Sequence, residues 1–281
     1  MTTRTPLRYP GGKSRITPFI QMVMDENKLT GGEYVEPYAG GAGVAINLLY
    51  SGHANHVHIN DINPAVFAFW TAVFDHTDAL CELICKTPVT METWHLQKSA
   101  LANPVGLSHL ELGFAAFFLN RTNRSGILTG GVIGGKDQTG KWKIDARYNV
   151  ESLCLKIESI STYRESVSIY NLDAESLLVQ LTDRLPAKSL IYLDPPYYVK
   201  SKRLYQDLYT HDDHVSLAQR VQGIKKPWLV SYDDVPEIRD IYSSLRVLRY
   251  PLNYSAAKKY LGAEALFVSP KLKLRENFLP V

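Results

Sequence analysis

The chain has few cysteines, and they form no recognisable framework. Cys81, Cys85 and Cys154 are the three cysteines in 281 residues, too few and too scattered for the disulfide pattern of a small secreted domain. Cys81 and Cys85 fall on one face of a helix, but no second pair completes a zinc site. We therefore expect reduced, packed thiols and no bound metal.

Long apolar runs and strong charge are missing as well. No stretch approaches the ~18 apolar residues of a membrane span, and the start of the chain has no apolar signal core. We therefore expect a cytoplasmic protein with no membrane partner. With 31 basic and 28 acidic residues the formal charge is +3, which allows a nucleic-acid partner without arguing for one, because binding depends on the clustering of charge.

The bulk composition is that of a globular protein, 45% apolar and 21% charged. There is no internal repeat, low-complexity tract or Pro/Ser-rich linker. A chain of this length predicts one large domain or a domain with a sizeable insertion.

The most informative stretch runs from Leu190 to Tyr198. Its first four residues are apolar and predict a buried strand. Asp194 follows, and then Pro195 and Pro196, which cannot donate to a sheet ladder and so end the strand. Tyr197 comes next. The result is a stiff loop with a carboxylate, a carbonyl and aromatic rings at the carboxyl end of a strand, where open α/β sheets bind ligands. An ordinary surface turn is the alternative.

A glycine-rich turn stands between a short strand and a helical pattern. It reads Glu36-Pro37-Tyr38-Ala39-Gly40-Gly41-Ala42-Gly43. Such a turn lets a nucleotide-like ligand approach the backbone. The strict dinucleotide spacing is absent, so a tight strand-to-helix connection without a ligand stays open.

Two further acids follow predicted strands. Asp61 lies 18 positions after Gly43, close to the ~20 expected of an acid that accepts hydrogen bonds from ribose hydroxyls. Asp173 follows the strand predicted at 167–170 and could meet a purine base. Both positions also suit a helix N-cap, and the two roles are compatible.

The first organised segment reads Arg8-Tyr9-Pro10-Gly11-Gly12-Lys13-Ser14. Its glycines allow a close backbone approach to a ligand, and a cation follows directly. The spacing of a triphosphate-binding loop is absent. A plain turn before a helix is the other interpretation of this segment.

A helical segment then leads into a polar, glycine-rich stretch. The helix predicted to end near 119 is followed by Asn120, Arg121, Asn123 and Arg124, side chains that can bind base edges or phosphates. Six glycines stand between Gly126 and Trp142. Residues 139–144 alternate like a hairpin strand that carries Lys141 and Lys143. We expect this region to recognise a target, although a solvated surface loop has the same texture. Residues 200–214, basic and rich in tyrosine, suit a lid or a nucleic-acid clamp, and a solvated loop is the equal alternative.

Strands that end in polar residues alternate with helices, which predicts a doubly wound α/β sheet. We expect a discontinuous catalytic domain at 1–66 and 161–281. A helical and hairpin insert is expected at 67–160.

Taken in order, these segments resemble the Dam-like class (D12 class, alpha group) of DNA N6-adenine methyltransferases. The resemblance rests on residues 9–13, 36–43, 61, 119–122 and 194–197, and it spans nearly the whole chain. It departs in Tyr9-Pro10, where many members have Trp-Ala. It also departs in residues 127–142, which are unlike those of members that methylate GATC, so that target is not carried over.

The resemblance implies a Rossmann-like methyltransferase sheet and S-adenosylmethionine as methyl donor, with no metal. It places Tyr9, Lys13, Asp61 and Asp194 against the methyl donor, in a pocket shaped by Glu36, Pro37, Tyr38, Gly40 and Gly43. Asp194, Pro195, Pro196 and Tyr197 would receive an adenine flipped out of duplex DNA.

We expect a monomer that acts on duplex DNA, encoded by a bacterium or a phage. A restriction system, another defence system and a stand-alone regulator are all compatible with the sequence. Two other functions stay open at this point. One is methyl transfer to RNA or to a protein amide, and the other is a DNA-binding subunit without activity.

Overall fold

The computed structural model describes residues 4–8, 13–199, 209–254 and 260–274. The chain divides into two compact units. The first comprises residues 1–12 and 61–171, and the second comprises residues 13–60 and 172–281. The sequence-based division at 67 and 160 stays a prediction about which residues carry which function.

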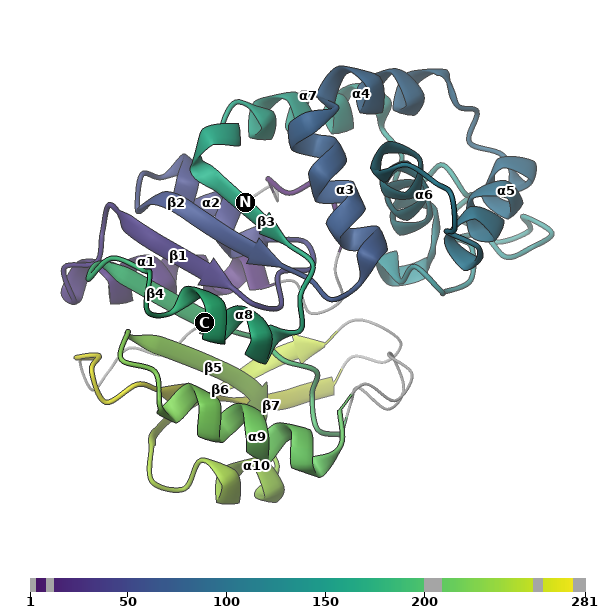
Figure 1. Ribbon diagram of the computed structural model, residues 1–281. Coiled ribbons are helices and arrows are strands. Elements are labelled where there is room, and N and C mark those ends of the chain that lie inside the picture. The colour runs from purple at the N-terminus through teal and green to yellow at the C-terminus, as the bar shows by residue number, and fades with distance from the viewer. Residues whose placement is uncertain (1–3, 9–12, 200–208, 255–259, 275–281) are drawn as a thin grey trace. The chain divides into compact units, whose positions relative to one another are not determined.

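The described residues include a seven-stranded, mostly parallel sheet with the strand order β3-β2-β1-β4-β5-β7-β6 (Figure 1). Its strands are β1 (Gly32–Glu36), β2 (Ala54–Asn60), β3 (Val167–Tyr170), β4 (Ser189–Leu193), β5 (Trp228–Asp233), β6 (Arg246–Tyr254) and β7 (Tyr260–Val268). The predicted doubly wound α/β fold is confirmed.

The β4 strand is central because it has parallel partners on both sides, β1 and β5. All of its residues are buried, as the continuous apolar run predicts for a strand covered on both faces. The chain order reverses between β1 and β4, so the switch point of this α/β sheet lies at their carboxyl ends.

Helical segments of the second unit connect these strands. They are η1 (Lys13–Ile16), α1 (Thr17–Glu26), α2 (Gly43–Tyr50), α8 (Ala174–Leu181), α9 (His211–Gln222) and α10 (Pro236–Ile241). At the end of the chain, β7 runs antiparallel to both β5 and β6. The β7 strand therefore begins at the edge of the sheet where the parallel strands end and runs away from that edge.

The first unit is mainly helical apart from β3. Its helical segments are α3 (Pro64–Asp75), α4 (Thr77–Lys86), α5 (Met91–Ala102), α6 (His109–Thr122), η2 (Arg124–Gly126), α7 (Val150–Ser161) and η3 (Arg164–Ser166). The α6 helix begins with a capping box between Ser108 and Glu111, which satisfies donors that the first turn leaves unpaired.

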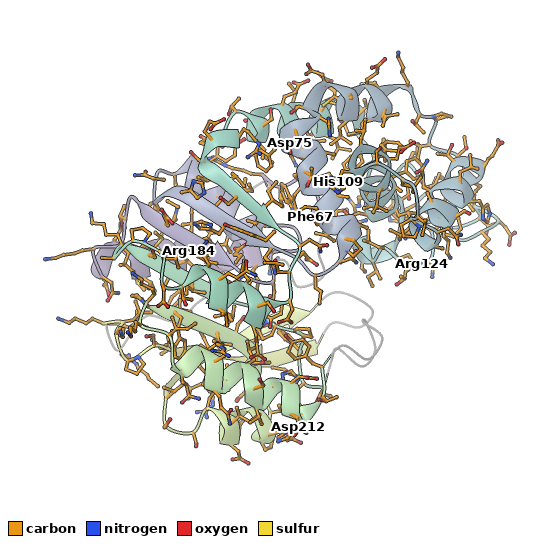
Figure 2. All side chains as sticks on the ribbon, viewed as in Figure 1. Phe67, Asp75, His109, Arg124, Arg184 and Asp212 are labelled. Carbon is orange, nitrogen blue, oxygen red and sulfur yellow. The ribbon has the colours of Figure 1, made fainter. Side chains whose placement is uncertain are left out.

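Aromatic packing joins α3 to α6 in this unit. Phe69 stacks on Phe117 with ring centroids 5.9 Å apart. Phe67 and His109, both labelled in Figure 2, meet edge to face with ring centroids 5.3 Å apart. Phe114, Phe117 and Phe118 of α6 are buried and belong to the core of this unit. The free thiols of Cys85 and Cys154 also lie in this unit, with their sulfur atoms 3.8 Å apart.

The hairpin strand predicted at 139–144 is wrong, because these residues form turns and bends. Gln138 explains the difference. Its side-chain amide donates to the carbonyls of Ile133 and Gly135, and its oxygen accepts from the amide of Ile144. These bonds satisfy the backbone groups that a partner strand would otherwise pair. The result is a compact loop instead of a ribbon.

Neither a metal cluster nor a membrane-length apolar helix is found in the described part of the chain.

Candidate active site

Asp194 lies directly beyond the end of β4, as its position before two prolines predicts. Leu193 pairs with Val230 of β5 in the sheet register, so Asp194 comes beside Ser231. The Ser231 hydroxyl donates to Asp194 Oδ1 at 2.6 Å. The loop after the strand is also held, since the amides of Tyr198 and Val199 donate to the buried Asp233 carboxylate at 2.9 and 3.1 Å.

Lys13 links this carboxylate to a second one. Its ammonium nitrogen lies 3.2 Å from Asp194 Oδ1 and 3.0 Å from Glu264 Oε2. It also donates to the Tyr197 hydroxyl at 2.5 Å. The predicted residues Lys13, Asp194 and Tyr197, far apart in sequence, thus meet in one hydrogen-bonded group.

Glu264 is the member of this group that the sequence did not predict. It lies on β7, opposite Asp233 of β5 and opposite Tyr250 of β6 in the register. Its side chain is 1% exposed. The hydroxyls of Tyr197 and Tyr250 both donate to its carboxylate, in addition to Lys13. A carboxylate that accepts this many hydrogen bonds is stabilised in its ionised form.

The two carboxylates of this group, Asp194 and Glu264, affect each other's ionisation and that of Lys13. Burial raises the pKa of Asp194 above its ordinary value, Lys13 opposes this, and the Glu264 charge adds to the rise. Burial lowers the pKa of Lys13, but the carboxylates of Asp194 and Glu264 outweigh burial and leave it raised. Lys13 therefore stays charged, and Asp194 is less acidic than a simple salt bridge would make it.

Two acceptors at the strand end are not used by any donor of the described residues. Asp194 is 24% exposed, and among the described residues its Oδ2 atom has no hydrogen-bond partner. Within the same part of the chain, nothing donates to the Pro195 carbonyl. A planar amine has two N–H groups, and a pair of neighbouring acceptors is the arrangement that binds it.

Glu36 ends β1 next to this group. It is 5% exposed and accepts from the Tyr34 hydroxyl and the Ala45 amide at 3.1 and 3.2 Å. Burial raises the pKa of Glu36 to about 8, with a smaller contribution from the charge of Asp194, while its two donors act in the opposite direction. Glu36 is therefore largely protonated at neutral pH, so that it can donate a hydrogen bond as well as accept one.

The glycine-rich turn after β1 is tight. Gly40 and Ala42 have φ values of 48° and 45°, in the left-handed region. A Cβ atom at Gly43 would lie 2.3 Å from the Ser14 hydroxyl oxygen, so a larger residue there would require the Ser14 side chain to turn away. The Asn60 amide group donates to the Pro37 carbonyl at 2.8 Å and holds the turn from the side.

The remaining predicted cofactor contacts lie as follows. The hydroxyls of Tyr38 and Tyr209 are 2.6 Å apart. Asp173 caps α8 by accepting from the amides of Glu175 and Ser176, and its carboxylate is exposed. Asp61 follows β2 directly and accepts from the amide of Asn63. Tyr9 and residues 200–208 of the predicted lid lie outside the described residues.

Comparison with known proteins identifies the family. The model of the D12 class of N6 adenine-specific DNA methyltransferases matches residues 9–100 and 136–255, most of the chain. The chain belongs to this family. The resemblance noted from the motifs is confirmed, and with it the coarse activity, methylation of adenine N6 in DNA. No curated protein matches the chain.

Solved structures similar to this D12 methyltransferase are distant. A candidate RNA methyltransferase, PH1948 from Pyrococcus horikoshii, covers 93% of this chain and 83% of its own with 8% identity and a TM-score of 0.42. LPL1258 from Legionella pneumophila, of the DUF519 family, covers 91% and 83% with 12% identity and a TM-score of 0.31. Likenesses this weak carry no argument about the substrate.

The predicted DNA contacts of the methyltransferase need one correction. Asn120 and Asn123 are 1% and 0% exposed. Asn120 accepts from the Arg8 amide and donates to the carbonyls of Arg8 and Gly126. Asn123 accepts from the indole of Trp94, and it donates to two carbonyls of the following loop. Both amide groups are fully used within the first unit, so we assign them a structural role instead of base recognition.

The cations of the same stretch are placed differently. Arg124, labelled in Figure 2, Lys141 and Lys143 are exposed. Arg121 is half-buried and donates to the carbonyl of Arg147 at 2.7 Å. Burial lowers the pKa of Arg121 to about 10, and the positive charges of Arg8 and Arg147 contribute. Arg8, Arg121 and Arg147 therefore form a local excess of positive charge in the first unit of the methyltransferase.

Proposed function

We propose that this D12 methyltransferase transfers a methyl group from S-adenosylmethionine to the N6 amine of one adenine in a specific duplex DNA sequence. The observation that carries the proposal is the pair of acceptors at the end of β4 that no donor of the described residues uses, Asp194 Oδ2 and the Pro195 carbonyl. The ionic group on the other Asp194 oxygen holds this carboxylate in place.

The residues at this edge of the sheet fit the proposed methyl donor. A nucleoside needs backbone that it can approach closely, and Gly40, Gly41 and Gly43 in the turn after β1 carry no side chains. A sulfonium cation needs negative charge, and two carboxylates face one ammonium in the group around Lys13. The donor supplies the methyl group, and the protein supplies orientation and charge.

The chemistry follows from the weak nucleophilicity of the adenine amine, whose lone pair is conjugated with the ring. Two acceptors on its hydrogens would orient the nitrogen toward the methyl group. They would also stabilise the positive charge that grows on the nitrogen, a case of electrostatic preorganisation. Asp194 would therefore act through its charge. Tyr197, whose hydroxyl is fixed by Lys13 and Glu264, offers its ring to the extruded base.

Recognition of the duplex is assigned to the first unit. Its exposed Arg124, Lys141 and Lys143 and the cluster around Arg121 suit an anionic backbone and base edges. Trp142, 62% exposed beside Lys141, adds a ring that can stack on a base.

The test is expression in a host without adenine methylation, followed by single-molecule sequencing of its DNA. We expect N6-methyladenine at one recurring sequence. Asp194→Asn preserves the size of the side chain and an acceptor for Ser231 but removes the charge. It should lower the rate of methyl transfer by about 10²-fold or more.

The thermal unfolding midpoint of Asp194→Asn serves as the control, since a folded but slow variant separates catalysis from stability. Methylation of RNA in preference to duplex DNA would contradict the proposed substrate. Wild-type rates in the variant would contradict the proposed chemistry.

A further inference from the structure

The three cysteines of the chain gather where α4 packs against α7 in the first unit. Cys81 and Cys85 stand one helical turn apart on α4, and Cys154 lies on α7. The sulfur atoms of Cys85 and Cys154 are 3.8 Å apart. The Cys154 thiol also donates to the Cys81 carbonyl oxygen at 3.9 Å. Two thiols that are 69 positions apart in sequence are therefore neighbours in the fold.

The two neighbouring thiols differ in their access to solvent. Cys85 is exposed near the end of α4, whereas Cys154 is buried. Burial raises the pKa of Cys154, and the nearby Cys81 adds to the rise. Cys154 therefore remains a protonated thiol at neutral pH. An oxidant in solution meets Cys85 first, and Cys154 lies behind it as the second thiol of the pair.

Packing fixes both helices at the positions of these thiols. Ile84 precedes Cys85, Leu153 precedes Cys154, and both apolar side chains are buried. The two sulfur atoms must come about 2 Å closer to reach the length of a disulfide bond. The exposed Cys85 side chain has solvent on one side, so it can move by this amount while the buried faces of α4 and α7 stay packed.

We propose that Cys85 and Cys154 form a modification site at which a peroxide converts two thiols reversibly into a disulfide. The Cys85 sulfur loses its proton and attacks one oxygen of hydrogen peroxide. The O–O bond breaks, Cys85 becomes a sulfenic acid, and the hydroxide that leaves takes up the thiol proton as water. The Cys154 sulfur then attacks the Cys85 sulfur. The S–S bond forms, the S–O bond breaks, and the oxygen leaves with the Cys154 proton as a second water.

Sulfur is oxidised and the peroxide is reduced in this sequence, and a dithiol reverses it by exchange. In reducing surroundings the pair rests as thiols until peroxide reaches it.

The bond would enclose residues 86–153, which include α5, α6 and the exposed Arg124, Lys141 and Lys143. A cross-link that closes a long loop stabilises the folded chain chiefly by restricting the unfolded one. Oxidation would therefore fasten together the two ends of the segment to which we assign duplex recognition. The chemistry of the thiols stands independently of that assignment.

The experiment exposes the purified, reduced full chain to hydrogen peroxide without denaturant and maps its peptides by mass spectrometry. A cross-linked peptide pair containing Cys85 and Cys154 should appear, and Cys81 should remain as the one free thiol. Dithiothreitol should restore all three thiols. The midpoint of thermal unfolding should rise by about 5 °C or more on oxidation and return on reduction.

Two variants on α4 serve as a matched pair. Cys85→Ser should abolish the cross-link, whereas Cys81→Ser, one turn earlier on the same helix, should retain it. Both variants leave Cys154 unchanged.

Three free thiols in the folded wild-type protein after peroxide treatment would overturn the inference. So would oxidation of Cys85 to a sulfinic acid without a cross-link, or a disulfide between Cys81 and Cys154. An unchanged unfolding midpoint in the fully cross-linked chain would overturn the stabilising effect assigned to the bond.

Discussion

Glu36 shows how far the site departs from ordinary side-chain chemistry. The carboxyl is buried at the end of β1, and its pKa is raised from 4.5 to about 8. In this pH interval the unfolded chain has lost the proton that the folded protein keeps. The contribution of Glu36 to stability is therefore fully present below pH 4.5. It is lost as the pH rises through about 8, and the loss is on the order of 5 kcal/mol.

Glu36→Gln should remove this part of the pH dependence. The amide does not titrate, so the variant should gain stability relative to the wild-type protein as the pH rises from 5 to about 8. Thermal unfolding of both proteins across this range measures the difference. Parallel stability curves would show that Glu36 titrates alike in the folded and unfolded states.

Some residues of the site were predictable and others were not, for physical reasons. Asp194 could be placed from the sequence because two prolines must end the strand before it. Glu264 could not, because its neighbours in sequence say nothing about Lys13, 251 positions away, to which it bonds. Asn120 and Asn123 stand beside arginines and look solvated. An amide that satisfies buried carbonyls and one that reads a base have the same local sequence.

At the scale of elements, the end of α6 depends on Asn123. Its side chain ties Trp94 of α5 to the loop carbonyls of Ile127 and Leu128. Asn123→Ala should leave these buried groups unpaired and lower the free energy of unfolding by about 3 kcal/mol. Urea titration followed by tryptophan fluorescence measures this change.

The neighbouring Arg124→Ala is the control, since Arg124 is exposed and its truncation should change stability by less than ~0.5 kcal/mol. The affinity of the folded variants for DNA should show the opposite pattern. It should fall clearly in Arg124→Ala and change little in Asn123→Ala. Equal stabilities of the two variants would contradict the structural role assigned to Asn123.

Elements themselves were predicted well where they are defined by burial. The strand predicted at 190–193, for example, follows from an apolar run that Asp194 and two prolines terminate, and every residue of β4 is buried. The loop at 139–144 was predicted wrongly as a hairpin strand. The side chains of Thr-Gly-Lys-Trp-Lys-Ile alternate as they do in a strand, but this alternation does not supply a partner strand. Whether a partner strand exists is decided elsewhere, here by the Gln138 side chain.

For the molecule as a whole, the small formal charge of +3 means that electrostatic binding is local. The affinity for duplex DNA should fall linearly with the logarithm of salt concentration, with a slope set by the few cations that reach phosphates. Lys141→Ala with Lys143→Ala should reduce that slope by about two, uniformly across DNA sequences.

Fluorescence anisotropy with labelled duplexes over a range of salt concentrations measures this slope. Lys225→Ala with Lys226→Ala serves as the control. These two lysines belong to the second unit, and their replacement changes the net charge by the same amount. An unchanged slope in the Lys141 and Lys143 variant would remove these lysines from the DNA contact.

The position of β7 has a consequence for how the enzyme comes into being. The strand is the last of the sheet in chain order, yet it lies between β5 and β6. While the protein is being synthesised, Asp194 and Lys13 leave the ribosome long before Glu264 does. The pair of carboxylates that binds Lys13, Asp194 and Glu264, is therefore complete only after the final strand has joined the sheet.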